Sequence, residues 1–143
     1  MLTITFGNHF KYHLANKDVN LASDTLKMAL MASGYTFNKD TAHGWSDVSA
    51  SEYADTAHGY TAGGATISTH TITESDANDR AEIDLSTVSW TATGADIGPT
   101  PGAIIYDDSE AGDVVVCYLD FGGNQTAASG TDLAVENVQL RVS

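Results

Sequence analysis

The sequence predicts a mainly β protein, a single β-sandwich domain of jelly-roll-like form that spans residues 1–143. Three observations lead to this expectation. Threonine, serine and glycine occur 17, 12 and 13 times, while charged residues make up only 17%, a composition typical of soluble β proteins. Short stretches of alternating apolar and polar residues recur between glycine-rich or acidic turns. The length is that of one domain, and no internal linker divides it.

The N-terminal third contains the predicted helices. Residues 2–6 alternate between apolar residues and threonine, the pattern of an edge strand with one apolar face. Residues 8–16 predict a short helix that Asn8 can cap. Residues 24–32 alternate again and favour a strand with one buried face, with a short helix as the alternative. A further helical turn is expected at 46–49.

From residue 63 onward the pattern indicates strands. They are expected, in order, at 65–73, 80–85, 88–93, 103–106, 114–121 and 133–142. The intervening turns and loops are expected at 75–79, 98–102, 107–112 and 122–130. The first two strands of this set form a hairpin, and the strand at 114–121, the most apolar, is expected to be central. The whole chain would then hold about seven strands.

Charge is distributed unevenly along the chain, whose net charge is −13. Residues 1–40 carry four lysines against three aspartates, whereas residues 41–143 carry two arginines against 16 acidic residues. So acidic a body would repel phosphate backbones, which argues against a nucleic-acid partner. The charge indicates either a well-solvated acidic surface or a near-neutral N-terminal segment that docks on a partner while the acidic body faces solvent.

The sequence gives no sign of membrane insertion or secretion. Its apolar stretches are far shorter than the roughly 20 residues of a membrane helix, so no membrane partner is expected. The N-terminal residues lack the basic and apolar regions of a secretory signal. A single cysteine, Cys117, excludes a disulfide framework and a cysteine zinc site.

The sequence contains no residue pattern that assigns a catalytic, cofactor-binding or metal-ligating role. His9 and His13 have the i, i+4 spacing of a zinc pair, but residue 10 is not glutamate and no third ligand is indicated nearby. Two exposed histidines are therefore expected, and His43 and His58, each followed by glycine, are expected to be turn residues. No cofactor is implied.

Acidic and thiol groups are also interpreted structurally. Residues 76–79 are expected to form a hairpin turn rather than a calcium loop, and 107–110 an acidic surface turn. Cys117 lies within an apolar strand and is expected to be an unreactive core thiol. The sequence therefore predicts a protein that is not an enzyme.

Several short segments, taken in their order and spacing, carry a resemblance. They include DTLKMAL at 24–30, GYTAGGA at 59–65 and YLDFG at 118–122, and the full set lies at 14–21, 24–30, 34–36, 45–48, 59–65, 78–81, 88–90, 103–107 and 118–122. Over roughly residues 10–125 the chain resembles a group of small virion structural proteins of tailed bacteriophages. The resemblance implies a non-enzymatic virion component and offers no catalytic residues.

Among virion components, a compact acidic β domain is similar to capsid decoration or cement proteins, which bridge neighbouring major capsid subunits. The expected partners are the major capsid protein and copies of the chain itself, as a homo-oligomer. The expected location is the outer surface of the head, after assembly in the bacterial cytoplasm, because the acidic charge is unsuited to a shell interior packed with DNA.

Other virion roles remain open at this point. A head–tail connector component is one alternative. Another is a tail or fibre module that binds glycans or a host surface through Tyr35, Trp45, Tyr53 and Tyr60, although these aromatic residues can equally anchor the 34–64 loop to the core or to a neighbour.

The N-terminal segment is the predicted contact with the capsid or an adjacent copy. Residues 1–14 hold more apolar residues than a short free terminus normally exposes, with Lys11 and Lys17 nearby. An edge strand of this kind can add to a neighbour's sheet or serve as the first strand of its own core, and both outcomes are open.

Overall fold

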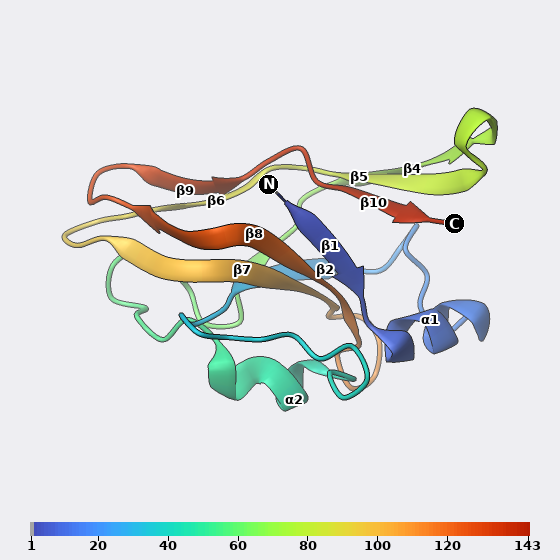
Figure 1. Cartoon of the computed structure of the whole chain (residues 1–143), viewed down its shortest axis with the longest axis horizontal. Helices are drawn as coiled ribbons and strands as arrows, with labels where there is room; N and C mark the ends of the chain where they lie inside the picture. The colour runs from blue at the N-terminus through green and yellow to red at the C-terminus, as the bar shows by residue number, and fades with distance from the viewer. Residues whose placement is uncertain (1) are drawn as a thin grey trace.

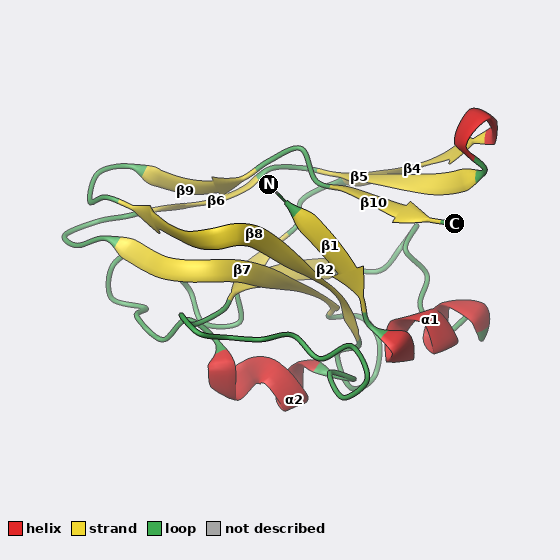
Figure 2. Cartoon of the chain, viewed as in Figure 1, coloured by secondary structure: helices red, strands yellow, loops and turns green. Residues whose placement is uncertain are grey.

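The computed structural model describes residues 2–143 and is mainly β, with 44% strand and 13% helix. The elements follow one another as β1 (Thr3–Phe6), α1 (Asn8–Ala15), β2 (Leu26–Leu30), α2 (Trp45–Val48), β3 (Ala65–Thr66), β4 (His70–Ser75), β5 (Arg80–Leu85), β6 (Val88–Thr91), β7 (Ile97–Asp107), β8 (Val115–Ala127), β9 (Asp132–Val135) and β10 (Gln139–Val142). The strands form antiparallel sheets with the orders β1-β8-β7-β2-β3, β10-β5-β4 and β6-β9 (Figure 2). The described part of the chain thus holds more strands than the seven predicted.

The two longest strands, β7 and β8, dominate the five-stranded sheet (Figure 1). The apolar strand predicted at 114–121 lies one place from the centre, because β7 is the middle strand. The break predicted at 98–102 is wrong, because these residues continue as strand within β7. The loop predicted at 122–130 is wrong for residues 122–127, which belong to β8, whereas residues 128–130 do leave the strand and turn. Register shifts between Ile97 and Gly102 interrupt the ladder with β8. Proline is tolerated at such bulges because no ladder N–H is required there.

One face of the five-stranded sheet packs against a large cluster of buried apolar residues, which we call the first core. The smaller sheets form the other side of this core and lie above the central strands in Figure 1. Its buried residues include Met28 of β2, Ile83 of β5, Trp90 of β6 and Leu133 of β9. Apolar residues from all three sheets therefore contact one another in a single cluster.

The opposite face is covered by residues 34–48, which include α2. Ala29 of β2 and Ile104 of β7 are buried there in a second core, and Trp45 stacks on Tyr106 with ring centroids 4.7 Å apart. The prediction that the strand at 24–32 has one buried face is therefore wrong. Both faces are buried because a long loop folds back over the sheet.

Two predicted strands are each divided between two sheets. Residues 65–73 supply β3 to the five-stranded sheet and the start of β4 to the hairpin with β5. Residues 133–142 supply β9, which pairs with β6, and β10, which pairs with β5. Asn137 between them adopts a left-handed conformation with φ 55°. Alternation continues through these interruptions, so it does not reveal a change of sheet.

The hairpin predicted around 75–79 is confirmed. β4 and β5 pair antiparallel, and Asp79 adopts a left-handed conformation with φ 50° in the turn. Ile83 and Leu85 are buried in the first core, as the alternation of β5 predicts. Cys117 is fully buried in β8, and burial raises the pKa of its thiol, which agrees with an unreactive core residue.

The N-terminal elements are confirmed with one correction. β1 is an edge strand paired with β8, and α1 follows it. Asn8 is the first helical residue rather than the cap, because Gly7 takes the cap position without a side-chain hydrogen bond. The Asn8 amide instead donates to the Asp40 carboxylate and ties α1 to the 34–48 segment.

The prediction of an acidic surface turn at 107–110 is wrong for its first residue, Asp107. Asp107 ends β7 and is fully buried. Its Oδ1 accepts hydrogen bonds from the backbone N–H of Ser109 at 2.9 Å and of Glu110 at 3.3 Å. Burial, reinforced by the Asp24 carboxyl, raises the pKa of Asp107 to about 7.

Candidate docking face

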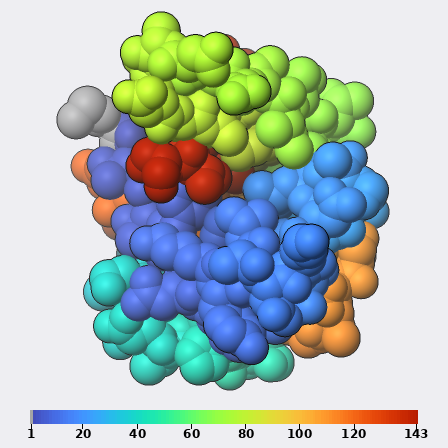
Figure 3. Space-filling view, turned by 90° about the vertical axis from the view of Figure 1, so that its right-hand side faces the viewer, coloured from blue at the N-terminus to red at the C-terminus, as the bar shows by residue number. Residues whose placement is uncertain are grey.

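One face of the molecule combines exposed apolar side chains with both basic and acidic residues. It is built from α1, the segment 16–22 that follows it, the β4–β5 hairpin and the end of β10. Figure 3 shows α1 and the following segment in blue below the yellow-green hairpin, with the end of β10 in red between them. We refer to the surface formed by residues 8–22, 70–85 and 139–143 as the docking face.

β1 and α1 hold the N-terminal side of the docking face. Phe10 is 1% exposed and stacks on Phe6, with ring centroids 5.6 Å apart. Because this side of the helix is buried, the opposite side carries Lys11 and Tyr12 into solvent, and Tyr12 is 62% exposed. The helix is therefore fixed in place while its outer side is accessible.

The segment after α1 presents a second lysine. Lys17 adopts a left-handed conformation with φ 67°, and the chain then turns back so that the Asp18 N–H donates to the His13 carbonyl at 3.0 Å. Val19 is buried, whereas Lys17 is exposed. Hydrogen bonds from Asn16 and His13 hold the pKa of the Asp18 carboxyl below its usual value.

β4 supplies an exposed apolar residue to the docking face. Ile72 is 42% exposed and, with Tyr12, is one of two large hydrophobic residues exposed in the described part of the chain. It pairs in register with the buried Ile83 of β5 and so lies on the inner face of the hairpin. β4 is also the outer strand of its sheet, and no other strand of residues 2–143 pairs with its free edge.

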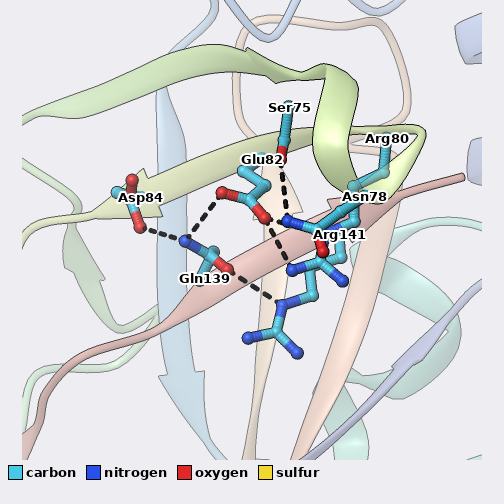
Figure 4. A network of polar contacts seen from close by, with 7 residues as sticks. All are labelled: Ser75, Asn78, Arg80, Glu82, Asp84, Gln139 and Arg141. Atoms are coloured by element: carbon cyan, nitrogen blue, oxygen red, sulfur yellow. Dashed lines mark hydrogen bonds and ion pairs between the residues drawn. The ribbon is translucent and has the colours of Figure 1, made fainter.

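A polar network on the outer face of the same sheet fixes β10 to β5 (Figure 4). Arg80 pairs with Glu82 at 2.6 Å. Gln139 Nε2 donates to Asp84 Oδ1 at 2.9 Å and, at 3.4 Å, to Glu82 Oε2. Gln139 Oε1 in turn accepts a hydrogen bond from Arg141 Nε at 2.9 Å. Arg141 is thus held by a neutral amide, and although it lies opposite Glu82 in the register, it forms no ion pair within residues 2–143.

Two grooves cross the docking face. The first, of about 450 Å³, lies between the segment 16–22 and the hairpin and is lined by Lys17 and by aliphatic side chains that include Ile72. The second, of about 410 Å³, is lined by Phe10, Lys11 and Arg141 among others. Although the chain holds 19 acidic residues, no acidic side chain of the described residues lines either groove.

The three cations of the grooves form no ion pair within residues 2–143. The ion pairs of that range involve other basic residues, such as Lys27 with Asp108 and Lys39 with Asp40. Apolar grooves edged by cations that lack an ion-pair partner suit a partner that offers apolar side chains and carboxylates.

The histidines of α1 differ from their prediction. His9 and His13, expected to be exposed, are half-buried, with their Nε2 atoms 2.8 Å apart. His13 Nδ1 lies 2.8 Å from the Asp18 carboxylate. His43, expected to be a turn residue, stacks on His9 with ring centroids 4.6 Å apart. Burial lowers the pKa of His9, and the neighbouring His13 and His43 lower it further.

The N-terminal apolar residues face inward. Leu2, Ile4 and Phe6 are half-buried and pack against the first core, so β1 is a strand of the chain's own sheet. Of the predicted contact segment 1–14, Met1 lies outside the described residues. The attachment role of this segment stays a prediction, with Lys11 as its exposed cation on α1.

Most of the aromatic residues predicted as a binding platform anchor the 34–64 segment. Tyr60 is buried, and its hydroxyl donates to Glu52 Oε1 at 2.7 Å and accepts from the Leu30 N–H at 3.0 Å. Tyr53 packs edge-on against Tyr60, and Trp45 stacks in the second core. These three rings therefore hold the long loop on the sheet.

The fourth predicted aromatic residue lines a different groove. This groove, of about 930 Å³, lies on the side of the molecule that carries residues 34–40. Tyr35 and Phe37 both contact Tyr118 there, with ring centroids 5.5 and 5.6 Å apart. Asp120 and Asn124 add polar groups to the lining. Burial raises the pKa of Tyr35 and of Tyr118 to about 12.

Sequence reasoning missed Ile72 and Arg141 as members of the docking face. Ile72 is a large aliphatic residue in an otherwise threonine-rich stretch, and Arg141 is one of two arginines in the acidic body. Both signals were present in the sequence. The position of these two residues beside α1 could not be predicted from the sequence, because it depends on the pairing of β10 with β5.

No helix within residues 2–143 combines the length and the apolar character that a membrane-spanning helix needs. No protein-family model, no curated protein and no solved structure matches the chain.

Proposed function

We propose that this protein is a non-enzymatic structural component of a tailed-bacteriophage virion that decorates the outer surface of the head. The docking face is the observation that carries the proposal, because two apolar grooves edged by cations without ion-pair partners occur on a chain of net charge −13. In this proposal the fold is a jelly-roll-like β-sandwich. The resemblance of the sequence to small virion proteins supports the same role.

The charge favours the outside of the shell. DNA phosphates fill the interior of a head, and a strongly acidic body placed against them would be repelled. With the docking face turned toward the major capsid protein, the acidic remainder faces solvent. Attachment across the boundary of two capsid subunits would stabilise their contact, which is the role of a cement protein.

Copies of the chain are the second proposed partner. The free edge of β4 carries backbone N–H and C=O groups that can pair with a strand of a neighbour. The proposed assembly on the particle is therefore a homo-oligomer whose copies also contact the major capsid protein.

A co-sedimentation assay with particles that lack this protein tests the attachment. The informative variants are Lys11→Glu on α1 and Ile72→Asn on β4. Their matched controls are Lys39→Glu, an exposed lysine outside the docking face, and Thr73→Asn, an exposed neighbour on the opposite face of β4. Point variants are preferred to deletion of residues 1–6, because β1 packs on the first core.

We expect each docking-face variant to weaken attachment by about tenfold or more while both controls bind as the parent protein does. Circular dichroism melts should show that all four variants are folded. Parent-like attachment of Lys11→Glu and Ile72→Asn, or equal losses in the controls, would contradict the proposed face.

The groove of Tyr35, Phe37 and Tyr118 favours a second candidate function, a tail or fibre module that binds glycans. Aromatic rings beside carboxylate and amide groups are suited to sugars. Binding on a glycan array that is lost in Phe37→Ala but retained in Trp45→Ala, whose ring does not line this groove, would favour this candidate. A head–tail connector component is the remaining alternative; its low copy number would separate it from a capsid decoration protein, and its position at the neck from a tail or fibre module.

A further inference from the structure

The two histidines of α1 are arranged as a pair of metal ligands. His9 and His13 are one turn apart on the helix, and their Nε2 atoms face each other at 2.8 Å. The spacing i, i+4 places two imidazoles on one side of a helix, which is the arrangement that zinc-binding helices use. The two rings meet edge to face, with centroids 4.3 Å apart.

Asp18 determines which nitrogen of His13 is available. The His13 Nδ1 lies 2.8 Å from the Asp18 carboxylate. An ionised carboxylate has no proton to donate, so it acts here only as a hydrogen-bond acceptor. Nδ1 therefore carries the proton, and Nε2 presents its lone pair toward His9. A carboxylate bound to the far nitrogen of a ligating histidine is the usual support of protein zinc sites.

Two further contacts hold the pair in place. The left-handed conformation of Lys17 returns the chain so that Asp18 lies beside His13, and Asn16 Nδ2 donates to the same Asp18 oxygen at 2.8 Å. On the other side, the His43 ring stacks on His9. The orientation of both imidazoles is thus set by groups outside the pair.

We propose that His9 and His13 bind a divalent transition-metal ion, with Zn²⁺ as the test ion, through their Nε2 atoms, and that Asp18 orients His13. Two Zn–N bonds of about 2.0 Å at a tetrahedral angle separate the nitrogens by roughly 3.3 Å. A small ring rotation, with the proton of His9 Nε2 moved through water to its Nδ1, therefore converts the hydrogen-bonded contact into a ligand pair. His13 is 19% exposed at its side chain, which leaves the pair accessible to an ion from solvent.

The remaining coordination positions fall to water. Within residues 2–143, no group of three or more histidine, cysteine, aspartate or glutamate side chains is placed around one point to hold a metal ion. The proposed site is therefore a two-ligand site with open positions, and it stands independently of the attachment role.

Isothermal titration calorimetry with zinc chloride at pH 7.5 tests the site in the full chain. We expect one ion per chain, at least about tenfold weaker binding in His9→Gln and in His13→Gln, and a loss of about 10- to 100-fold in Asp18→Asn. The matched control is His58→Gln, because His58 has the same 2.8 Å contact to a carboxylate, that of Asp55, outside the α1 pair. It should bind zinc as the parent protein does.

The imidazole nitrogens of the parent protein give a second measurement that does not depend on the folding of variants. In ¹H–¹⁵N spectra, added Zn²⁺ should shift the Nε2 signals of His9 and His13 together and leave those of His58 and His70 in place. The absence of a one-to-one binding event would overturn the proposal. So would parent-like binding by His9→Gln and His13→Gln, or equal shifts at all four imidazoles.

Discussion

Asp107 should make the stability of this protein fall as the pH rises from about 4 to 7. The side chain is fully buried at the end of β7, and its Oδ2 has no hydrogen-bond partner in the described part of the chain. Burial and the nearby Asp24 carboxyl raise its pKa from 3.8 to about 7. A carboxyl with a raised native pKa binds its proton more tightly in the folded state than in the unfolded state.

The sign and the size follow from proton linkage. The stabilising proton is present in full below the unfolded pKa of 3.8, and its contribution is lost as the pH rises through about 7. The difference between these two pKa values corresponds to about 4 kcal/mol. Asp107→Asn keeps an oxygen for the N–H groups of Ser109 and Glu110 but carries no charge, so it removes this pH dependence.

Urea denaturation followed by tryptophan fluorescence at pH 4.5, 6 and 8 measures the effect. We expect Asp107→Asn to raise the free energy of unfolding by about 2–4 kcal/mol at pH 8 and to change it by less than about 1 kcal/mol at pH 4.5. Asp108→Asn is the control, since it removes an exposed carboxyl whose 3.3 Å ion pair with Lys27 contributes little. Parallel stability curves for Asp107→Asn and the parent from pH 4.5 to 8, or destabilisation at pH 8, would refute the reasoning.

Three further predictions concern the core. Tyr60→Phe should lower the free energy of unfolding by about 1–3 kcal/mol in urea, because it leaves the buried Leu30 N–H without its acceptor; an unchanged midpoint would contradict this. Gly64 has φ +78°, and a Cβ added to it would lie 2.0 Å from a β2 carbonyl oxygen, whereas a Cβ added to Gly130 would meet open space. Gly64→Ala should therefore lower the melting temperature far more than Gly130→Ala. Equal decreases in melting temperature would be evidence against this packing. Cys117 should react with a thiol reagent only after unfolding, because it is fully buried and its thiol pKa is raised; rapid labelling of the native protein would disprove its burial.

Local alternation predicted the strands that have one covered face. In β5, Ile83 and Leu85 face the first core while the intervening residues form the polar network, so a period of two was a sufficient guide. The same rule failed for β2, where Ala29 is as buried as its neighbours. The second covered face arises from residues 34–48, which are distant in sequence and form little regular structure.

Interruptions were the other source of error. Prolines between Ile97 and Gly102 indicated a break, but bulges in the pairing with β8 accommodate them within one strand. The opposite error occurred at Asn137, where alternation continued although the chain changed sheets. Both outcomes depend on which strands become neighbours, and neighbouring residues in the sequence do not encode that choice.

In the candidate sites, too, some residues could be predicted from the sequence and others depended on tertiary structure. Lys11 and Lys17 could be assigned to a contact surface from the charge asymmetry of the chain. Ile72 and Arg141 could not, because the hairpin and β10 reach α1 only through tertiary packing. For the histidines, the spacing of the pair was visible in the sequence, whereas the supporting Asp18 depended on the left-handed turn at the end of α1.

The central claim, attachment to the outside of a capsid, is tested most directly by an image reconstruction of the particle that carries this protein. We expect density for the chain on the outer surface of the head, in a copy number close to that of the major capsid protein, with α1 and the β4–β5 hairpin toward the shell. Density for only six or twelve copies at the neck, a location on the tail, or a docking face turned toward solvent would contradict the account.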